Sequence, residues 1–146
     1  MDHTDDVLHR FYFEEANVRG VIVQLRRTWQ QIAHRDDYPE PVRRWLAEAA
    51  TATALFAGDV KFSGSVSVHL KTRSTLRLVF AECSSEGHMR GVARWEAGTP
   101  IPESPADVAG DGGVLALTVM RDSGEPKWQG IVPLEGDTLA AAFEAY

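Results

Sequence analysis

One segment of the sequence is apolar on nearly every side, and it constrains the fold more than any other. From Pro41 to Ala57 the residues follow a helical pattern, and after Arg43 and Arg44 the only ionisable residue is Glu48. The other positions are mainly Trp, Leu, Phe, Ala and Thr. A helix that is apolar nearly all round is buried, so this one must be covered on more than one side. Its many small side chains would let sheets approach it closely.

Proline and glycine mark the predicted ends of this helix. Pro39 and Pro41 favour an extended entry, and Pro41 is well placed as the first helical residue. Gly58 and Asp59 are predicted to end the helix. The chain has 146 residues, of which 44% are hydrophobic. That is enough for one compact domain with a core, and we find no linker that would divide it into two.

Short runs of β-branched and aromatic residues predict strands on both sides of the helix. The predicted strands are Val7 to Phe13, Val18 to Leu25, Ser65 to Leu70, Leu76 to Ala81, Met89 to Trp95, Val114 to Met120 and Trp128 to Leu134. A short helix is predicted at Trp29 to Ala33, and a long surface loop at Ala97 to Gly113. We therefore expect an α/β (α+β) fold with a layered β/α/β core, in which mostly antiparallel sheets enclose the central helix.

Three of these strands contain a glycine between a long polar residue and a β-branched one, at Gly20, Gly91 and Gly130. Glycine in a strand interior lowers stability, so its presence needs a reason. We interpret these positions as bulges, or as places where another backbone or an aromatic ring comes close. A glycine-lined ligand groove is the alternative.

The sequence ends in a predicted helix that Asp137 or Thr138 can cap, because a short side-chain oxygen accepts from the free amides of the first turn. One face of this helix carries Leu139, Ala142, Phe143 and Tyr146. So short a helix is not stable alone. It must dock its apolar face or continue in a longer native chain, and we expect the 146 residues to be a fragment.

The formal net charge of −6 is concentrated in the last third of the chain. Residues 1–95 carry 13 Lys and Arg against 12 Asp and Glu, whereas residues 96–146 carry two against nine. Such a surface repels a phosphate backbone, so we expect no nucleic-acid partner. The start MDHTDD is acidic where a secretory signal is basic, and no apolar run approaches the roughly 20 residues that cross a bilayer. We expect a cytoplasmic protein with no membrane partner.

The chain offers little for catalysis or metal binding. Its five histidines and single cysteine show no metal-ligand spacing, and one cysteine cannot form an internal disulfide. Cys83 is predicted just past a strand, next to Glu82, whose charge disfavours the thiolate. His34, Asp36 and Asp37 could form an acid–base cluster, although helix caps are the simpler interpretation. We expect no cofactor and no metal in this chain, and a small-molecule enzyme that uses these three residues is an alternative.

Five motifs, taken in order, resemble a single protein family. They are V-R-G at Val18 to Gly20, D-Y-P-x-P-V at Asp37 to Val42, K-F-x-G with a later V-x-L at Lys61 to Leu70, M-R-G-V-A-R at Met89 to Arg94, and Q-G-I-V-x-L-E-G-D-T-L-A at Gln129 to Ala140. Over essentially its whole length the sequence is similar to the bacterial 33 kDa heat-shock holdases, the redox-regulated chaperones.

The resemblance implies a cytoplasmic chaperone that holds unfolded client proteins during oxidative or heat stress. In the family, a C-terminal C-x-C and C-x-x-C set binds zinc when reduced and forms two disulfides when oxidised. This chain departs from the family there, because it does not contain those four cysteines. We therefore expect residues 1–146 to be the chaperone core domain, truncated at its C-terminal end and without the zinc-binding redox switch.

A holdase needs accessible apolar surface and enough net charge to keep its complexes in solution, and it needs no catalytic residues. We expect apolar residues near the end of the chain to bind unfolded clients, a second copy of the chain, or the remainder of a cleaved chain. The predicted binding residues are Trp128, Ile131, Leu134, Leu139 and Phe143. An interaction or structural module without chaperone activity is the alternative.

Overall fold

The computed structural model describes residues 5–61 and 63–146, and within them it contains seven strands and four helices. The strands are β1 (Val7–Phe13), β2 (Val18–Gln24), β3 (Gly64–Lys71), β4 (Leu76–Ser84), β5 (Met89–Trp95), β6 (Val114–Arg121) and β7 (Pro126–Val132). The helices are α1 (Arg27–Ala33), α2 (Glu40–Asp59), α3 (Pro105–Ala109) and α4 (Leu139–Ala145).

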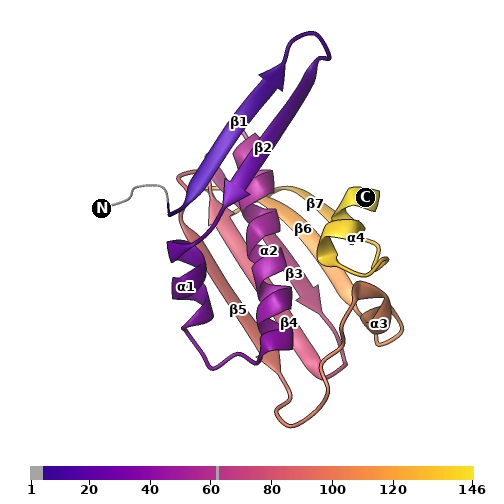
Figure 1. The fold of residues 1–146 in the computed structure, drawn as a ribbon. Coiled ribbons are helices and arrows are strands. Elements are labelled where there is room, and N and C mark those ends of the chain that lie inside the picture. The colour runs from indigo at the N-terminus through magenta and orange to yellow at the C-terminus, as the bar shows by residue number, and fades with distance from the viewer. Residues whose placement is uncertain (1–4, 62) are drawn as a thin grey trace.

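Helix α2 lies across one face of a five-stranded antiparallel sheet with the strand order β5-β4-β3-β6-β7 (Figure 1). Its buried residues meet an inner sheet face of alternate valines, leucines and alanines. Fully buried side chains at this contact are Val42, Leu46, Ala49, Ala50, Val66, Val68, Leu70, Val79 and Ala81. Helices α1 and α4 flank α2 on its two sides (Figure 1). The predicted α/β fold with a central helix packed on antiparallel sheets is confirmed.

Strands β1 and β2 form a separate antiparallel hairpin, in which Val7 pairs with Gln24 and Phe13 with Val18. The hairpin meets α2 near its C-terminal end and extends beyond the rest of the molecule (Figure 1). The prediction that Gly58 and Asp59 end the helix is confirmed, because α2 ends at Asp59. A Cβ atom at Gly58 would lie 3.0 Å from Val21 Cγ1, so this glycine lets the hairpin approach the helix.

The predicted loop from Ala97 to Gly113 contains the short helix α3, which the sequence interpretation missed. Ser104 is its N-cap residue, and the Ser104 backbone N–H donates to Asp107 Oδ2 at 3.2 Å. Pro105 occupies the first turn, where proline is tolerated, and Val108 is fully buried. A cap and one buried side chain therefore fix a turn of helix within a segment rich in proline and glycine.

Candidate functional site

Four apolar side chains gather on one face of the β1–β2 hairpin. Phe11 pairs with Gly20 and Phe13 with Val18, and His9 pairs with Ile22. Because side chains alternate between the two faces of a strand, this register places Phe11, Phe13, Val18 and Ile22 together. Their exposed fractions lie between 39% and 59%. We call these four residues the hairpin apolar face, and an exposed cluster of this kind is typical of an interaction surface.

The ring of Phe11 lies directly over Gly20. A Cβ atom at Gly20 would be 2.1 Å from Phe11 Cζ, which no side chain can tolerate. Phe11 also contacts Phe13 edge-to-face, with ring centroids 5.4 Å apart. At Gly130 an added Cβ would likewise come within 2.5 Å of the Trp128 ring. The interpretation that strand glycines accept a close aromatic ring is confirmed at these two positions.

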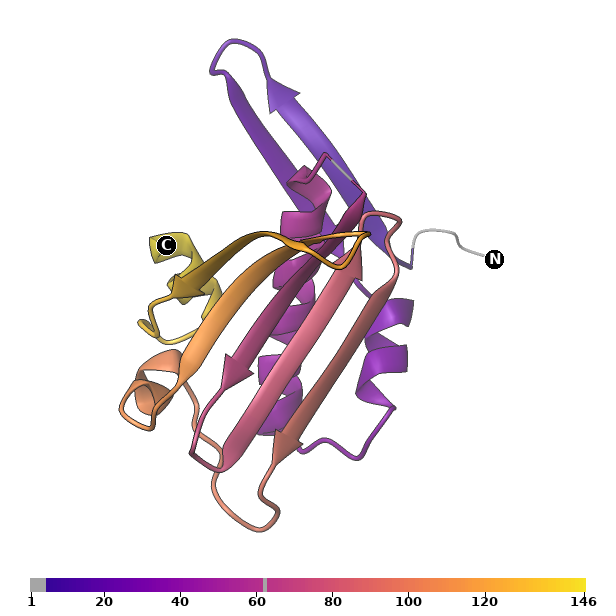
Figure 2. The ribbon, with the colours of Figure 1, turned by 180° about the vertical axis from the view of Figure 1, so that it is seen from behind.

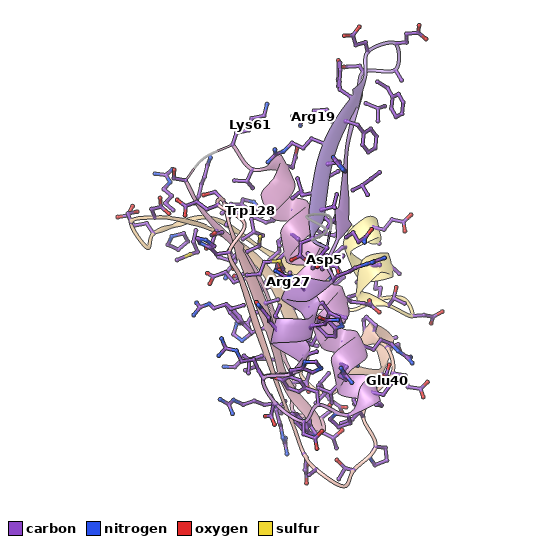
Figure 3. All side chains as sticks on the ribbon, turned by 60° about the vertical axis from the view of Figure 1, so that its left-hand side comes forward. Asp5, Arg19, Arg27, Glu40, Lys61 and Trp128 are labelled. Atoms are coloured by element: carbon purple, nitrogen blue, oxygen red, sulfur yellow. The ribbon has the colours of Figure 1, made fainter. Side chains whose placement is uncertain are left out.

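The opposite face of the hairpin is anchored to the end of α2. Arg10 Nε donates a hydrogen bond to the carbonyl oxygen of Gly58 in the last turn of the helix, where a positive charge is favourable. Arg19 and Asp59 form an ion pair at 3.8 Å, which contributes little because both side chains are largely exposed. Figure 3 labels Arg19 on the hairpin and Lys61 to one side of it, just after the end of α2. The hairpin apolar face is thus held away from the helix.

A second uncovered surface is the face of the five-stranded sheet opposite α2. Figure 2 shows this outer face with no helix crossing in front of it. It carries exposed Val114 and Ile131, and half-buried Leu78, Phe80 and Val92. Polar residues of β3 lie between them, so the outer face is mixed and not uniformly apolar.

Phe80 lies near the middle of the outer face. The ring of His69 meets it edge-to-face at 5.8 Å, and the guanidinium of Arg90 lies 5.5 Å from its centroid. Burial lowers the pKa of His69, and the nearby charge of Lys71 lowers it further. His69 is half-buried because Phe80 covers part of it.

An apolar groove of about 600 Å³ lies between α2 and α4. Its lining includes Ala47, Thr51, Leu55, Phe56, Ala140 and Phe143. The rings of Phe56 and Phe143 pack edge-to-face at 5.4 Å. One side of α2 is therefore covered only in part within the described residues, which explains why Leu55 is exposed.

The five predicted binding residues do not share one surface. Trp128 and Ile131 are 45% and 58% exposed, but they face opposite sides of the sheet, because Trp128 pairs with Val119 and Ile131 with Ala116. Leu139 is only 1% exposed and belongs to the core. The remaining two, Leu134 and Phe143, are half-buried. The sequence interpretation also missed the hairpin apolar face, although the alternation in β1 and β2 carries its signal.

The chain matches the family model described as Hsp33 protein over residues 6–146. The chain belongs to the Hsp33 family. It is 43% identical over 143 residues to the 33 kDa chaperonin of Photobacterium profundum, covering 98% of this chain and 48% of that protein. It is 40% identical over 143 residues to the 33 kDa chaperonin of Neisseria meningitidis serogroup A, covering 97% and 47%.

The fold is also that of a solved Hsp33 structure. The crystal structure of the 33 kDa chaperonin from Thermotoga maritima matches with a TM-score of 0.80 at 19% sequence identity. The match covers 97% of this chain and 50% of that one. The chain therefore spans about half the length of the Hsp33 relatives that it matches.

Within the described part of this Hsp33 chain, the predicted acid–base cluster does not assemble. His34, Asp36 and Asp37 are exposed in the turns after α1. The hydrogen bond found among them joins backbone to side chain: the Asp37 N–H donates to Asp36 Oδ1 at 2.7 Å. This is a local turn contact, and the three side chains do not converge as general acid–base chemistry requires.

Cys83 lies inside β4, not just past a strand, and its side chain is buried. Burial raises the pKa of the Cys83 thiol, and the negative charge of Glu82 raises it further. No group of three or more potential metal ligands occurs in residues 5–61 and 63–146. Nor does any helix in these ranges have the length and apolar character of a membrane span.

Proposed function

We propose that this chain is the core domain of a holdase, a chaperone that binds unfolded client proteins under oxidative or heat stress in the cytoplasm. One observation carries the proposal: a chain of the Hsp33 family presents two β-surfaces that carry exposed apolar side chains and that no other described element covers. They are the hairpin apolar face and the outer face of the five-stranded sheet.

The physical basis is burial of apolar area without specific chemistry. Unfolded clients expose apolar side chains, and each Å² removed from water contributes about 25 cal/mol. Sheet surfaces with mixed apolar and polar residues accept many sequences, because burial is not directional. The net charge of −6 keeps such complexes in solution through mutual repulsion.

In this proposal, Ile131 belongs to the outer face, and exposed Trp128, on the other side of β7, provides a separate client contact. Leu134 and Leu139 lie outside the lining of the groove between α2 and α4, whereas Phe143 lines it. The exposed rim of that groove pairs with a second copy or with another segment of the family protein. Either occupant would cover Leu55 and the free edge of Phe143.

Redox control is proposed to depend on the family's cysteine set, none of which is among these 146 residues. Cys83 takes no part in it, because its thiol is buried and its pKa is raised. A low-pKa, accessible thiol is what a redox sensor requires.

Light scattering from a thermally unfolding client tests the proposal. The full-length protein, added after oxidation, is expected to suppress aggregation at a near-stoichiometric ratio, and reduction is expected to abolish the effect. Suppression that is absent in both states would favour the alternative of a plain interaction module. Cys83→Ser should leave both results unchanged.

A further inference from the structure

Strand β5 has an open hydrogen-bonding edge. Among residues 5–61 and 63–146, it is the last strand of the sheet on its side and pairs with β4 alone. The backbone N–H of Ala93 donates to Tyr38 Oη at 3.4 Å, so it points away from β4. Because backbone groups alternate along a strand, the N–H groups of Met89 and Gly91 point to the same side. No neighbouring strand receives them in the structure.

A groove of about 480 Å³ runs along this edge, between β5 and α1. Figure 1 shows α1 beside β5, and the two elements are in contact. The wall from α1 includes Thr28, Gln31 and Ile32. A Cβ at Gly91 would lie 3.2 Å from Ile32 Cγ2, so the helix packs against the inner side of the strand and leaves its edge accessible.

The groove is positively charged, although the protein is negative overall. Arg35, Arg90 and Arg94 line it, and Asp36 is the one acid in the lining. Arg90 already pairs with Glu82 through a contact of 2.6 Å between Nε and Oε2. Within the described residues, the guanidinium groups of Arg35 and Arg94 have no hydrogen-bond or ion-pair partner. Two unpaired cations beside a free strand edge favour an acidic ligand.

We propose that this groove binds an extended acidic segment of a client polypeptide, which adds to β5 as a further strand. The backbone of the segment pairs with Met89 and Gly91, as in other cases of strand addition. Arg90 and Arg94 lie on the same face of β5, with Val92 between them. Carboxylates four residues apart, with an apolar residue midway, would therefore match the strand. One would bind at Arg94 and the other at the terminal N–H donors that Arg90 retains beside its Nε contact with Glu82. The inference rests on the proposed function, since the segment belongs to a client.

Peptide binding to the full-length protein tests the inference. A fluorescein-labelled peptide containing Glu-Thr-Val-Thr-Glu is measured by fluorescence anisotropy. Two matched peptides accompany it, one with Gln in place of Glu and one with the same acidic sequence but N-methylated at alternate amides. The acidic peptide is expected to bind about tenfold more tightly than the Gln peptide. The N-methylated peptide should not bind, since it cannot form the strand pairing.

Two variants and one exchange measurement complete the test. Arg94→Gln should weaken binding of the acidic peptide about tenfold, whereas Arg44→Gln, the same charge change on exposed α2 surface, should not. Hydrogen exchange should slow at the amides of Met89 and Gly91 when the peptide is present, and stay constant at Val92, which pairs with β4. Equal binding of all three peptides, or unchanged exchange at Met89 and Gly91, overturns the inference. If the inference fails in this way but Arg94→Gln still suppresses client aggregation, the proposed holdase function remains supported.

Discussion

The carboxylate of Glu48 on α2 accepts a hydrogen bond from the backbone N–H of Leu139 at 2.7 Å. The same oxygen also accepts from the N–H of Ala140 at 3.3 Å. Thr138 Oγ1 supplies the local cap by accepting from the N–H of Ala141 at 3.0 Å. Helix α4 is too short to be stable alone, so a cap from a distant helix and burial of Leu139 hold it in place.

Glu48→Ala is therefore expected to loosen α4. The variant should lower the free energy of unfolding by about 1–2 kcal/mol, because it leaves amides of the first turn without an acceptor. Urea denaturation measures this, and hydrogen exchange at residues 139–145 should accelerate. Glu14→Ala, an exposed change in the hairpin turn, is the control. A denaturation midpoint for Glu48→Ala equal to that of the control would contradict the assigned role.

Gly20→Ala tests the contact between Phe11 and the hairpin backbone. The added methyl group would occupy the position of the Phe11 ring, so we expect the free energy of unfolding to fall by about 1–3 kcal/mol. Gly110→Ala is the matched control, since no atom lies within 4 Å of a Cβ there. Combining Gly20→Ala with Phe11→Ala should give a smaller loss than the sum of the two. Additive losses would show that the ring and the glycine are independent.

The pH dependence of stability tests the environment of His69. Its pKa is lowered from 6.5 by burial first and by Lys71 second. The unfolded chain therefore binds a proton at a pH where the folded protein does not. The free energy of unfolding should fall as pH drops below 6.5 towards the folded-state pKa. Urea denaturation at several pH values measures this dependence. His69→Gln should reduce the slope of the free energy of unfolding against pH below 6.5. An unchanged slope would show that another titrating group causes the pH dependence.

Much of the fold followed from local pattern. Strand β5 has the predicted bounds, Met89 to Trp95, because alternation and β-branched residues coincide there. Helix α2 was recognised from its nearly uniform apolar character. Its end at Gly58 and Asp59 was predicted as well, whereas the packing of Gly58 against Val21, a contact made across the chain, was not. The short helix α3 was missed because the prolines and glycines around it indicate a loop, whereas the cap at Ser104 and burial of Val108 stabilise one turn of helix.

The candidate site was less predictable. The interpretation of the last residues gave a correct cap at Thr138, but nothing local shows that Glu48 reaches the same helix and that Leu139 becomes core. The open edge of β5 depends on strand order, which a single sequence does not specify. The hairpin apolar face is local in origin, and the register of β1 and β2 alone would have located it.

The central claim is that an uncovered apolar β-surface binds unfolded clients, and one comparison tests it most directly. The full-length double variant Phe13→Ser/Ile22→Ser changes the hairpin apolar face, whereas Tyr12→Ser changes an exposed residue on the opposite face of the same hairpin. Both are assayed after oxidation for suppression of aggregation of a thermally unfolding client, with the free energy of unfolding measured in parallel. The account predicts that the double variant suppresses several-fold less aggregation than wild type while Tyr12→Ser stays close to wild type. Equal suppression by all three proteins would contradict it.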